Sequence, residues 1–423
     1  MGDLASAEII AVGSELLTPT RLDTNSLTLT ERLNALGIQV HAKAVVGDRP
    51  GDLAALLQGA LQRVDLVVLT GGLGPTDDDV TRDVVSGVLE LALHEDTAIT
   101  EVLASRFARR GMAMPDINRR QAMVPAGAVV LPNMHGTAPG LWIEHGGRIV
   151  VLLPGPPREM VPMFDAHVQP RLAPRTSGAR LFTRVIRVFG RSESHAEEAV
   201  RPCYARWAAG TPPIEVTILA ARGAIDLHLS AVAHAPEIAA AVLDPAAAEA
   251  AAAFGDDVYS QSDDTIEQVV GEMLRARGWR IAAAESCTGG MLLARLTDVP
   301  GSSAYVDSGI VCYSNEAKIS LVGVDASLIA AHGAVSEPVA VAMAAGIRQR
   351  TGAHVGIGIT GIAGPGGGTP TKPVGTVCLA VEMPGASAVR TRWSVGGRDL
   401  IRVIATHAAL DMLRRLMTGR PVP

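Results

Sequence analysis

The sequence predicts an α/β protein with a doubly wound parallel sheet at its amino-terminal end, a small α+β module and a second α/β domain. Three observations support this prediction. Strand-like and helix-like segments alternate along most of the chain, which is typical of parallel sheets with helical crossovers. Hydrophobic residues make up 48% of the 423 residues but aromatic residues only 3%, so the cores must be aliphatic. Glycine- and proline-rich loops follow several strands, at the position where α/β folds bind ligands.

The first domain is expected to span residues 1–172. We predict strands at 8–12, 38–45, 65–70, 129–131, 141–143 and 149–153, and helices at 25–36, 52–63, from about 81 and near 99–110. Gly37 fits the end of the first helix, because glycine readily adopts the left-handed conformation that closes helices. The turn His145-Gly146-Gly147 predicts a hairpin between the last two strands.

A smaller α+β module is expected over residues 173–258. We predict strands near 183–189, 215–220 and 226–231, and helices near 193–208 and 237–254. Arg180, Arg184, Arg187 and Arg191 fall in or beside its first strand and raise the alternative of RNA binding. The module has no basic GxxG loop and no aromatic stacking platform, so a solvated strand is the favoured interpretation.

The last domain is expected to span residues 259–423 and to form a second α/β unit. We predict helices at 265–277, 338–351 and 398–417, and strands at 280–284, 306–313, 355–360, 374–381 and 389–395. The two large domains show no convincing sequence repeat, so each is expected to hold a separate site.

Composition argues against several classes of protein. The formal charge of −6 argues against a general binder of nucleic acid or membrane surfaces, because such proteins carry a basic excess. The four cysteines lie far apart without a CxxC pair, which fits a reducing cytoplasm and argues against a thiolate zinc site. No apolar run reaches the roughly 18 residues of a membrane span. We therefore expect a cytoplasmic protein.

Lysine is scarce in this chain. All but three of its 37 basic residues are arginine, and the exceptions are Lys43, Lys318 and Lys372. An arginine side chain does not lose its proton in proteins, whereas a lysine amine can. A retained lysine is therefore a candidate for proton transfer, although chance persistence explains any single lysine equally simply.

A glycine-rich, acidic loop follows the predicted strand 65–70. It reads Thr70-Gly71-Gly72-Leu73-Gly74-Pro75-Thr76-Asp77-Asp78-Asp79. Its glycines let backbone N–H groups approach an anion. Carboxylates repel a phosphate unless a cation lies between them, so Asp77 and Asp78 predict a divalent metal site. The alternative, that an aspartate only caps the next helix, is disfavoured by further polar strand exits at 13–15, 23–25, 133–140 and 154–159.

Ser286 is a candidate nucleophile in the last domain. It lies in Glu285-Ser286-Cys287-Thr288-Gly289-Gly290, between a predicted strand and a helix, with backbone donors nearby. A serine there is often only a helix cap, so the prediction depends on a base. Lys318 closes the segment 313–318 after another strand and is expected to meet Ser286. A neutral lysine accepts a hydroxyl proton when burial or a nearby cation lowers its pKa.

Further residues are expected around this pair. Tyr313 and Ser303 are candidates to relay the proton. The loop 360–368 is rich enough in glycine to cradle a phosphate, and Arg398 at the start of the last helix is placed to pair with it. Cys287 is the rival nucleophile, but no histidine lies close by in sequence to activate it.

Together these motifs resemble the CinA family. GGLGPTDDD at 71–79, NMHGTAPG at 133–140 and PGPPREM at 154–160 are similar to its N-terminal domain, which is related in fold to molybdopterin-binding proteins. AESCTGG at 284–290, YSNEAK at 313–318, GAVSEP at 333–338 and TGIAGPGGG at 360–368 are similar to its C-terminal amidohydrolase domain. The segment between them corresponds to the family's KH-like module.

For the C-terminal domain, the resemblance implies deamidation of nicotinamide mononucleotide (NMN) to nicotinate mononucleotide and ammonia, without a cofactor. Ser286 would be the nucleophile, Lys318 its base, and Tyr313 and Ser303 their assistants. The residues expected to bind or orient the nucleotide are Thr288, Gly289, Thr360, Gly361 and Arg398.

For the N-terminal domain, the resemblance implies an ADP-ribose pyrophosphatase that requires a divalent metal and is helped by potassium. Asp77 and Asp78 would bind the metal. The residues expected to bind the substrate are Asn25, Gly71, Gly72, Gly74 and Thr76. The alternative is a non-catalytic molybdopterin-like or partner-binding scaffold linked to competence or DNA damage. We also expect a homodimer, because enzymes of this kind are commonly symmetric oligomers.

Overall fold

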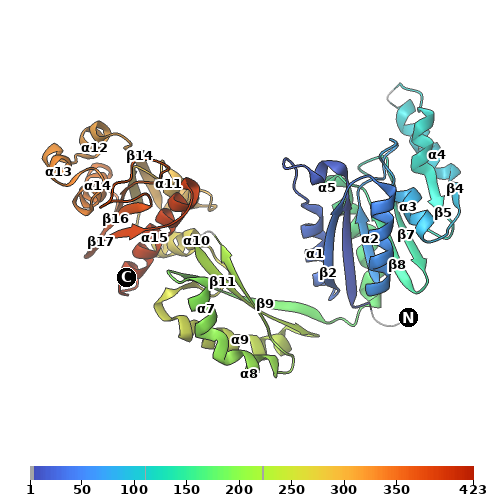
Figure 1. Ribbon diagram of the computed structural model, residues 1–423, viewed down its shortest axis with the longest axis horizontal. Helices are drawn as coiled ribbons and strands as arrows, with labels where there is room; N and C mark the ends of the chain where they lie inside the picture. The colour runs from blue at the N-terminus through green and yellow to red at the C-terminus, as the bar shows by residue number, and fades with distance from the viewer. Residues whose placement is uncertain (1–3, 110, 222) are drawn as a thin grey trace. The chain divides into compact units, whose positions relative to one another are not determined.

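The computed structural model describes residues 4–109, 111–221 and 223–423 (Figure 1). The chain divides into two compact units, residues 1–182 with 232–239 and residues 183–231 with 240–423. Helices and strands alternate through both large domains, which confirms the predicted α/β class. The last residue of the helix predicted near 99–110 lies outside the described residues, and the helix begins at Thr97.

A six-stranded sheet with the order β2-β1-β3-β8-β7-β6 forms the core of the N-terminal domain. Its strands are β1 (Ser6–Val12), β2 (Gln39–Val46), β3 (Leu66–Thr70), β6 (Val129–Leu131), β7 (Gly140–His145) and β8 (Arg148–Leu153). The sheet is parallel except for β7, which runs antiparallel to both of its neighbours, β8 and β6. The cause is the predicted hairpin, whose Gly146 and Gly147 both have positive φ and reverse the chain within two residues.

Helices cover both faces of this sheet. The helices α1 (Asn25–Ala35) and α5 (Pro157–Met163) pack on one face, and α2 (Pro50–Arg63) and α3 (Thr81–Val88) pack on the other. Further elements are η1 (Ser14–Leu17), β4 (Leu93–Glu95), α4 (Thr97–Ala108), η2 (Asp116–Ala122), β5 (Met123–Pro125), η3 (Phe164–Val168), α6 (Gln169–Leu172) and η4 (Ala173–Arg175). The parallel strands β1, β3 and β8 bring their carboxyl ends, and the loops that follow, to one edge.

The middle module is a four-stranded sheet with the order β10-β11-β9-β12. Its elements are β9 (Arg180–Phe189), α7 (Glu193–Val200), η5 (Arg201–Cys203), α8 (Tyr204–Ala208), β10 (Glu215–Ala221), β11 (Ala224–Ala233), α9 (Pro236–Phe254), η6 (Gly255–Asp257) and β12 (Val258–Ser260). The helix predicted at 193–208 is interrupted at η5, because Pro202 has no N–H group for the helical hydrogen bond.

Helix α9 is the one helix in the described ranges with the length and mean hydropathy of a membrane span. Its apolar character comes mainly from alanine. Ala239, Leu243, Ala250 and Phe254 recur at helical spacing and are buried, while Glu237 and Asp244 are exposed. This pattern is typical of a helix that packs one face against a sheet.

The C-terminal domain has a five-stranded sheet with the order β14-β13-β15-β16-β17. Its strands are β13 (Ile281–Glu285), β14 (Val306–Val311), β15 (Val355–Gly361), β16 (Thr376–Met383) and β17 (Ala386–Trp393), the last two antiparallel. The helices α10 (Ile266–Ala276), α11 (Met291–Thr297) and α15 (Arg398–Met417) cover one face, and α12 (Asn315–Val322), α13 (Ala326–His332) and α14 (Glu337–Thr351) the other. In β15, Gly356 and Gly358 let α14 approach closely, since a Cβ at either would lie 2.2 Å from a helix carbonyl oxygen.

Candidate functional sites

Ser286 begins the turn that joins β13 to α11. Its backbone N–H donates to the carbonyl oxygen of Ile359 in β15 at 2.9 Å, which anchors the turn to the neighbouring strand. Gly289 and Gly290 follow with φ values of 60° and 90°. Residues with side chains rarely adopt this left-handed conformation, so the two glycines allow the turn to form.

Lys318 lies in the first turns of α12, directly after β14. The helix begins there because the Ser314 side chain accepts a hydrogen bond from the N–H of Ala317. The Lys318 Nζ lies 3.0 Å from the Ser286 Oγ, and it also donates to the carbonyl oxygens of Cys312 at 3.1 Å and Tyr313 at 3.2 Å. The lysine is only 2% exposed. The structure thus brings together the two residues that the sequence singled out.

The surroundings of Lys318 disfavour its charged form relative to a lysine in water. Burial lowers the pKa of Lys318 below its usual value, and in the described part of the chain no carboxylate forms an ion pair with it. A neutral amine has two N–H donors, and two carbonyl oxygens are within reach. The third neighbour is the hydroxyl of Ser286, which lies close enough to pass its proton to a neutral Lys318.

Arg398 connects the first residue of α15 to this site. Its guanidinium donates to the hydroxyl of Tyr313 at 3.0 Å and to the carbonyl oxygen of Gly364 at 2.8 Å. Tyr313 is 60% exposed. These contacts place the tyrosine, the arginine and the glycine-rich loop together beside the Ser286–Lys318 pair.

Thr360 and Gly361 end β15 next to Ser286. The buried Thr360 hydroxyl donates to the carbonyl oxygen of Ala334 at 2.8 Å, so in this structure it fixes the loop before α14. A Cβ at Gly361 would lie 2.8 Å from the carbonyl oxygen of Thr376. Both residues border the site, and both are constrained by the chain around them.

Ser303 does not join this group within one chain. It lies in η7 (Ser302–Ala304), before the amino end of β14, whereas Tyr313 and Lys318 follow the carboxyl end. A strand of this length spans about 20 Å. The expectation that Ser303 assists Ser286 is therefore corrected, because Ser303 lies at the opposite end of β14 from Tyr313 and Lys318.

The other candidates from the sequence have different surroundings. Burial raises the pKa of Cys287 to about 12, so its thiol stays protonated at neutral pH. Lys372 donates to the carbonyl oxygens of His332 at 2.9 Å and Val335 at 2.7 Å, and these hydrogen bonds stabilise the loop before α14. Lys43 is exposed on β2. Of the three lysines, only Lys318 contacts the candidate nucleophile.

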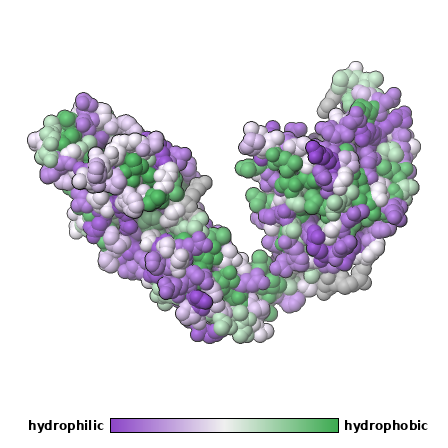
Figure 2. Space-filling view, in the orientation of Figure 1, coloured by the Kyte–Doolittle hydropathy of each residue, from purple (hydrophilic) through white to green (hydrophobic). Residues whose placement is uncertain are grey.

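In the N-terminal domain, loops at the strand ends enclose a pocket of about 710 Å³. Asn25, Gly71, Gly72 and Gly74 line it as expected. Asn25 donates to the hydroxyl of Thr70 at 3.0 Å and to the carbonyl oxygen of Gly155 at 2.7 Å, so it ties three loops together. The mouth has hydrophobic residues around the start of α1, where Figure 2 shows a hydrophobic patch.

The glycine-rich loop of this pocket is tightly constrained. Gly71 has a φ of 102°, and a Cβ there would lie 2.1 Å from the carbonyl oxygen of Val12. The Asp79 carboxylate accepts from the N–H of Thr76 at 2.9 Å and from its hydroxyl at 2.6 Å, and Gly74 leaves room for it. Thr76 therefore holds the loop together and does not line the pocket.

Of the two predicted metal ligands, Asp77 and Asp78, only one lies in the pocket. Asp77 is fully exposed and pairs with Arg120 at 2.9 Å outside the pocket, so its assignment as a ligand is corrected. Asp78 does line the pocket. The acidic residues that line the pocket are Glu15, Asp23, Asp48, Asp78, Asp79 and Glu159.

Among the residues with assigned positions, no three His, Cys, Asp or Glu side chains form a ready metal site. Mg²⁺ commonly binds one or two carboxylates and completes its shell with water and substrate phosphates. The pocket therefore fits a metal that arrives with a phosphate ligand, with Asp78 as the carboxylate partner.

Comparison with known proteins agrees with this arrangement of domains. Residues 8–174 match the family described as "Probable molybdopterin binding domain", 183–260 the damage-inducible protein CinA KH domain, and 263–417 the CinA C-terminal domain. A relative from Symbiobacterium thermophilum, named for competence-damage inducibility, is 47% identical over 427 residues, which cover 98% of this chain and 99% of the relative. The chain belongs to the CinA family.

A second relative matches over the full chain, whereas a solved structure matches over about a third of it. A CinA-like protein of Acidobacterium capsulatum is 46% identical over 415 residues, or 97% of this chain and 99% of the relative. The crystal structure of competence/damage inducible protein CihA from Agrobacterium tumefaciens has 38% identity and a TM-score of 0.35, and covers 36% of this chain and 96% of that chain.

In this CinA protein, most arginines in or beside β9, the first strand of the middle module, form ion pairs with carboxylates. Arg184 contacts Asp244 at 2.8 Å, and Arg191 contacts Asp257 at 2.7 Å. Arg187 contacts Asp263 at 2.5 Å. These carboxylates neutralise much of the positive charge that suggested RNA binding.

Two charged residues of the C-terminal site were given no role by the sequence analysis. The fully buried Glu285 carboxylate accepts from the N–H groups of Gly290, Leu292 and Leu293, each at 3.1 Å. Arg402 donates to the carbonyl oxygen of Thr288 from Nη2 at 2.7 Å. A sequence signal for Arg402 exists, since it follows Arg398 by one helical turn and shares its face of α15.

Proposed function

We propose that the C-terminal domain of this CinA protein hydrolyses the amide of NMN to nicotinate mononucleotide and ammonia. The observation that carries the proposal is the 3.0 Å contact between the buried Lys318 amine and the Ser286 hydroxyl. A substrate with one amide and one phosphate suits a serine nucleophile beside a glycine-rich loop and Arg398. No carboxylate in the described ranges pairs with the Arg398 guanidinium, so it is available to an anion.

The proposed chemistry uses Lys318 in its neutral form. Lys318 accepts the proton of the Ser286 hydroxyl while the oxygen attacks the amide carbon. Lys318 then returns the proton to the nitrogen, the C–N bond breaks, and ammonia leaves. Water attacks the resulting ester with Lys318 again as the base, which releases the acid and restores Ser286.

Ammonia release from NMN tests this proposal. Ser286→Ala removes the nucleophile, and Lys318→Arg replaces the base with a side chain that does not lose its proton. We expect kcat to fall by about 10²–10⁴-fold in Lys318→Arg, the usual contribution of general base catalysis. Lys43→Arg, on an exposed strand of the other domain, is the matched control and should leave kcat unchanged. Undiminished ammonia release in either site variant would contradict the assigned role.

We further propose that the N-terminal pocket hydrolyses the pyrophosphate of ADP-ribose with a divalent metal, with potassium as a further cation. The pocket volume, the glycine-rich loop and Asp78 support this proposal. The metal would be held by Asp78 and would neutralise charge on the phosphates. Asp78→Ala and excess chelator should each abolish turnover. Asp77→Ala, whose carboxylate lies outside the pocket, is the matched control, and equal losses in both variants would contradict the assignment.

A further inference from the structure

The turn after Ser286 leaves two backbone donors without an oxygen acceptor. The N–H of Ser286 is used by Ile359, and that of Gly289 donates to the carbonyl oxygen of Ser286 at 3.1 Å. The N–H of Gly290 donates to Glu285. In the described part of the chain, the N–H groups of Cys287 and Thr288 donate to no oxygen.

These two N–H groups directly follow the nucleophile. In hydrolases with a serine at a strand-to-helix corner, the N–H after the serine commonly binds the oxyanion of the tetrahedral intermediate. Such donors accelerate the reaction only when they are already held in position before the oxyanion forms. The groups that hold this turn in place are therefore expected to affect the rate of the reaction.

The turn is held from two sides. On one side, the Glu285 carboxylate binds three N–H groups at the start of α11. On the other side, Arg402 donates to the Thr288 carbonyl oxygen from Nη2 at 2.7 Å and from Nε at 3.3 Å. Arg402 is the only side chain in the described ranges that donates to a carbonyl oxygen between residues 286 and 290. Its remaining ion pair, with the exposed Asp399, is long at 3.9 Å.

We propose that Arg402 is a positioning residue, which holds the N–H groups of Cys287 and Thr288 where the oxyanion forms. This inference deepens the amide hydrolysis proposed above, and it concerns any acyl or phosphonyl transfer to Ser286. Arg402 itself contacts neither the nucleophile nor the base. It acts by fixing the peptide plane that follows Thr288.

A fluorophosphonate probe tests the turn independently of NMN. In that reaction the Ser286 oxygen forms a bond to phosphorus, fluoride leaves, and Lys318 takes the hydroxyl proton. The phosphoryl oxygen then occupies the oxyanion position. We would measure the rate of Ser286 labelling and the kinetics of ammonia release in wild type, Arg402→Gln and Arg402→Lys. Arg350→Gln, an exposed arginine of α14, is the matched control.

We expect both Arg402 variants to label about 10- to 100-fold more slowly, which is less than the loss of an oxyanion donor itself. For ammonia release, kcat should fall by a similar factor while KM for NMN stays within about two-fold, because Arg402 does not touch the substrate. The thermal midpoint of each variant separates this effect from unfolding, and Arg402→Lys keeps the charge if Arg402→Gln does not fold.

Labelling at the wild-type rate in a folded Arg402 variant would overturn the proposal, as would a rise in KM without a fall in kcat. Should wild type release no ammonia from NMN but still be labelled at Ser286, slow labelling of the Arg402 variants would support the positioning role while the NMN activity fails. The two proposals are thus distinguishable.

Discussion

At the scale of single residues, the ionisation of Lys318 controls the chemistry. A base must be deprotonated, so activity should rise with pH as Lys318 loses its proton. Burial lowers the pKa of Lys318 from 10.5, and the rising limb should therefore have its midpoint below pH 10.5. The measurement is kcat/KM for NMN from about pH 6 to about pH 11.5. A limb centred at or above 10.5 would show that the lysine is not perturbed as the structure indicates.

The neighbouring Cys287 illustrates why residue type alone does not decide the nucleophile. A thiol is intrinsically more reactive than a hydroxyl, but only as the thiolate. Burial raises the pKa of Cys287 to about 12, and Lys318 directs its amine to Ser286 instead. The surroundings of the two side chains, and not their order in the motif, favour the serine.

At the scale of elements, the glycine-rich loop after β3 should tolerate no added side chain. In Gly71→Ala, a methyl group would lie 2.1 Å from the carbonyl oxygen of Val12, at a φ that disfavours alanine. We expect a loss of about 1–3 kcal/mol in the free energy of unfolding, and loss of ADP-ribose binding measured by calorimetry.

Gly87→Ala provides the matched control for this loop variant. Gly87 is exposed in α3 and an added Cβ would meet nothing within 4 Å. Alanine is the better helix former, so this variant should gain up to about 1 kcal/mol. A Gly71→Ala protein as stable as wild type would mean that the loop is not held against β1.

Many helices and strands could be predicted from the sequence, and others could not. Strand and helix periodicity located nearly all sheet strands, because burial repeats every two or every 3.6 residues. The short helix α12 was missed, since its start depends on the cap formed by Ser314. Strand-end motifs predicted the contact of Ser286 with Lys318. The role of Arg402 depends on where α15 packs against the turn after Ser286, and that requires the tertiary fold.

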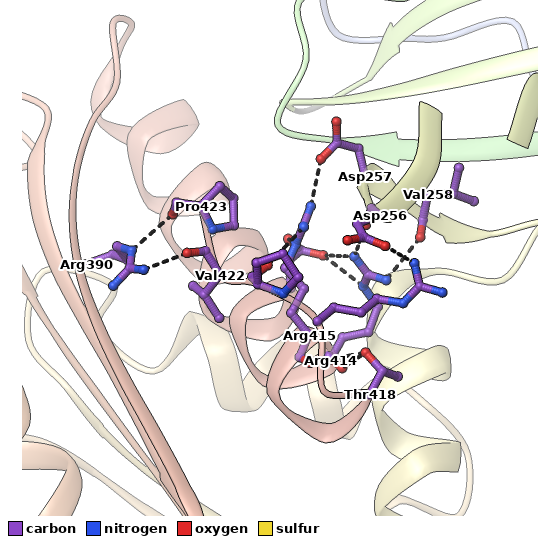
Figure 3. A network of polar contacts seen from close by, with 12 residues as sticks. Asp256, Asp257, Val258, Arg390, Arg414, Arg415, Thr418, Val422 and Pro423 are labelled. Atoms are coloured by element: carbon purple, nitrogen blue, oxygen red, sulfur yellow. Dashed lines mark hydrogen bonds and ion pairs between the residues drawn. The ribbon is translucent and has the colours of Figure 1, made fainter. Parts of the chain in front are cut away.

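At the scale of the whole molecule, α15 connects the middle module to the C-terminal site. Its first turns carry Arg398 and Arg402, and its last turns carry a network of buried charges shown in Figure 3. Arg414 and Arg415 share the buried Asp411 at 2.6 and 2.7 Å. Arg414 also donates to the carbonyl oxygen of Val258 at 3.0 Å, and Arg415 reaches Asp257 at 2.8 Å.

Asp257 makes part of this network depend on pH. Burial alone would raise the pKa of Asp257, but hydrogen bonds from Arg415 and Arg191 lower it below 3.8. The folded protein then binds fewer protons at this group than the unfolded chain does. The stabilisation from Asp257 is therefore complete above about pH 4 and is lost as the pH falls through the lower, folded-state pKa.

The network predicts that the middle module and the C-terminal domain lose stability together when Asp411 is changed. Asp411→Asn leaves two buried guanidinium groups without a full counter-charge, which should cost about 3–5 kcal/mol. Asp244→Asn breaks the exposed pair with Arg184 and should cost at most about 1 kcal/mol. Urea unfolding followed by tryptophan fluorescence measures both, since Trp207, Trp279 and Trp393 lie in this unit. Equal costs for the two variants would mean that the buried charges do not link the module to α15, and that α15 is positioned by its apolar packing alone.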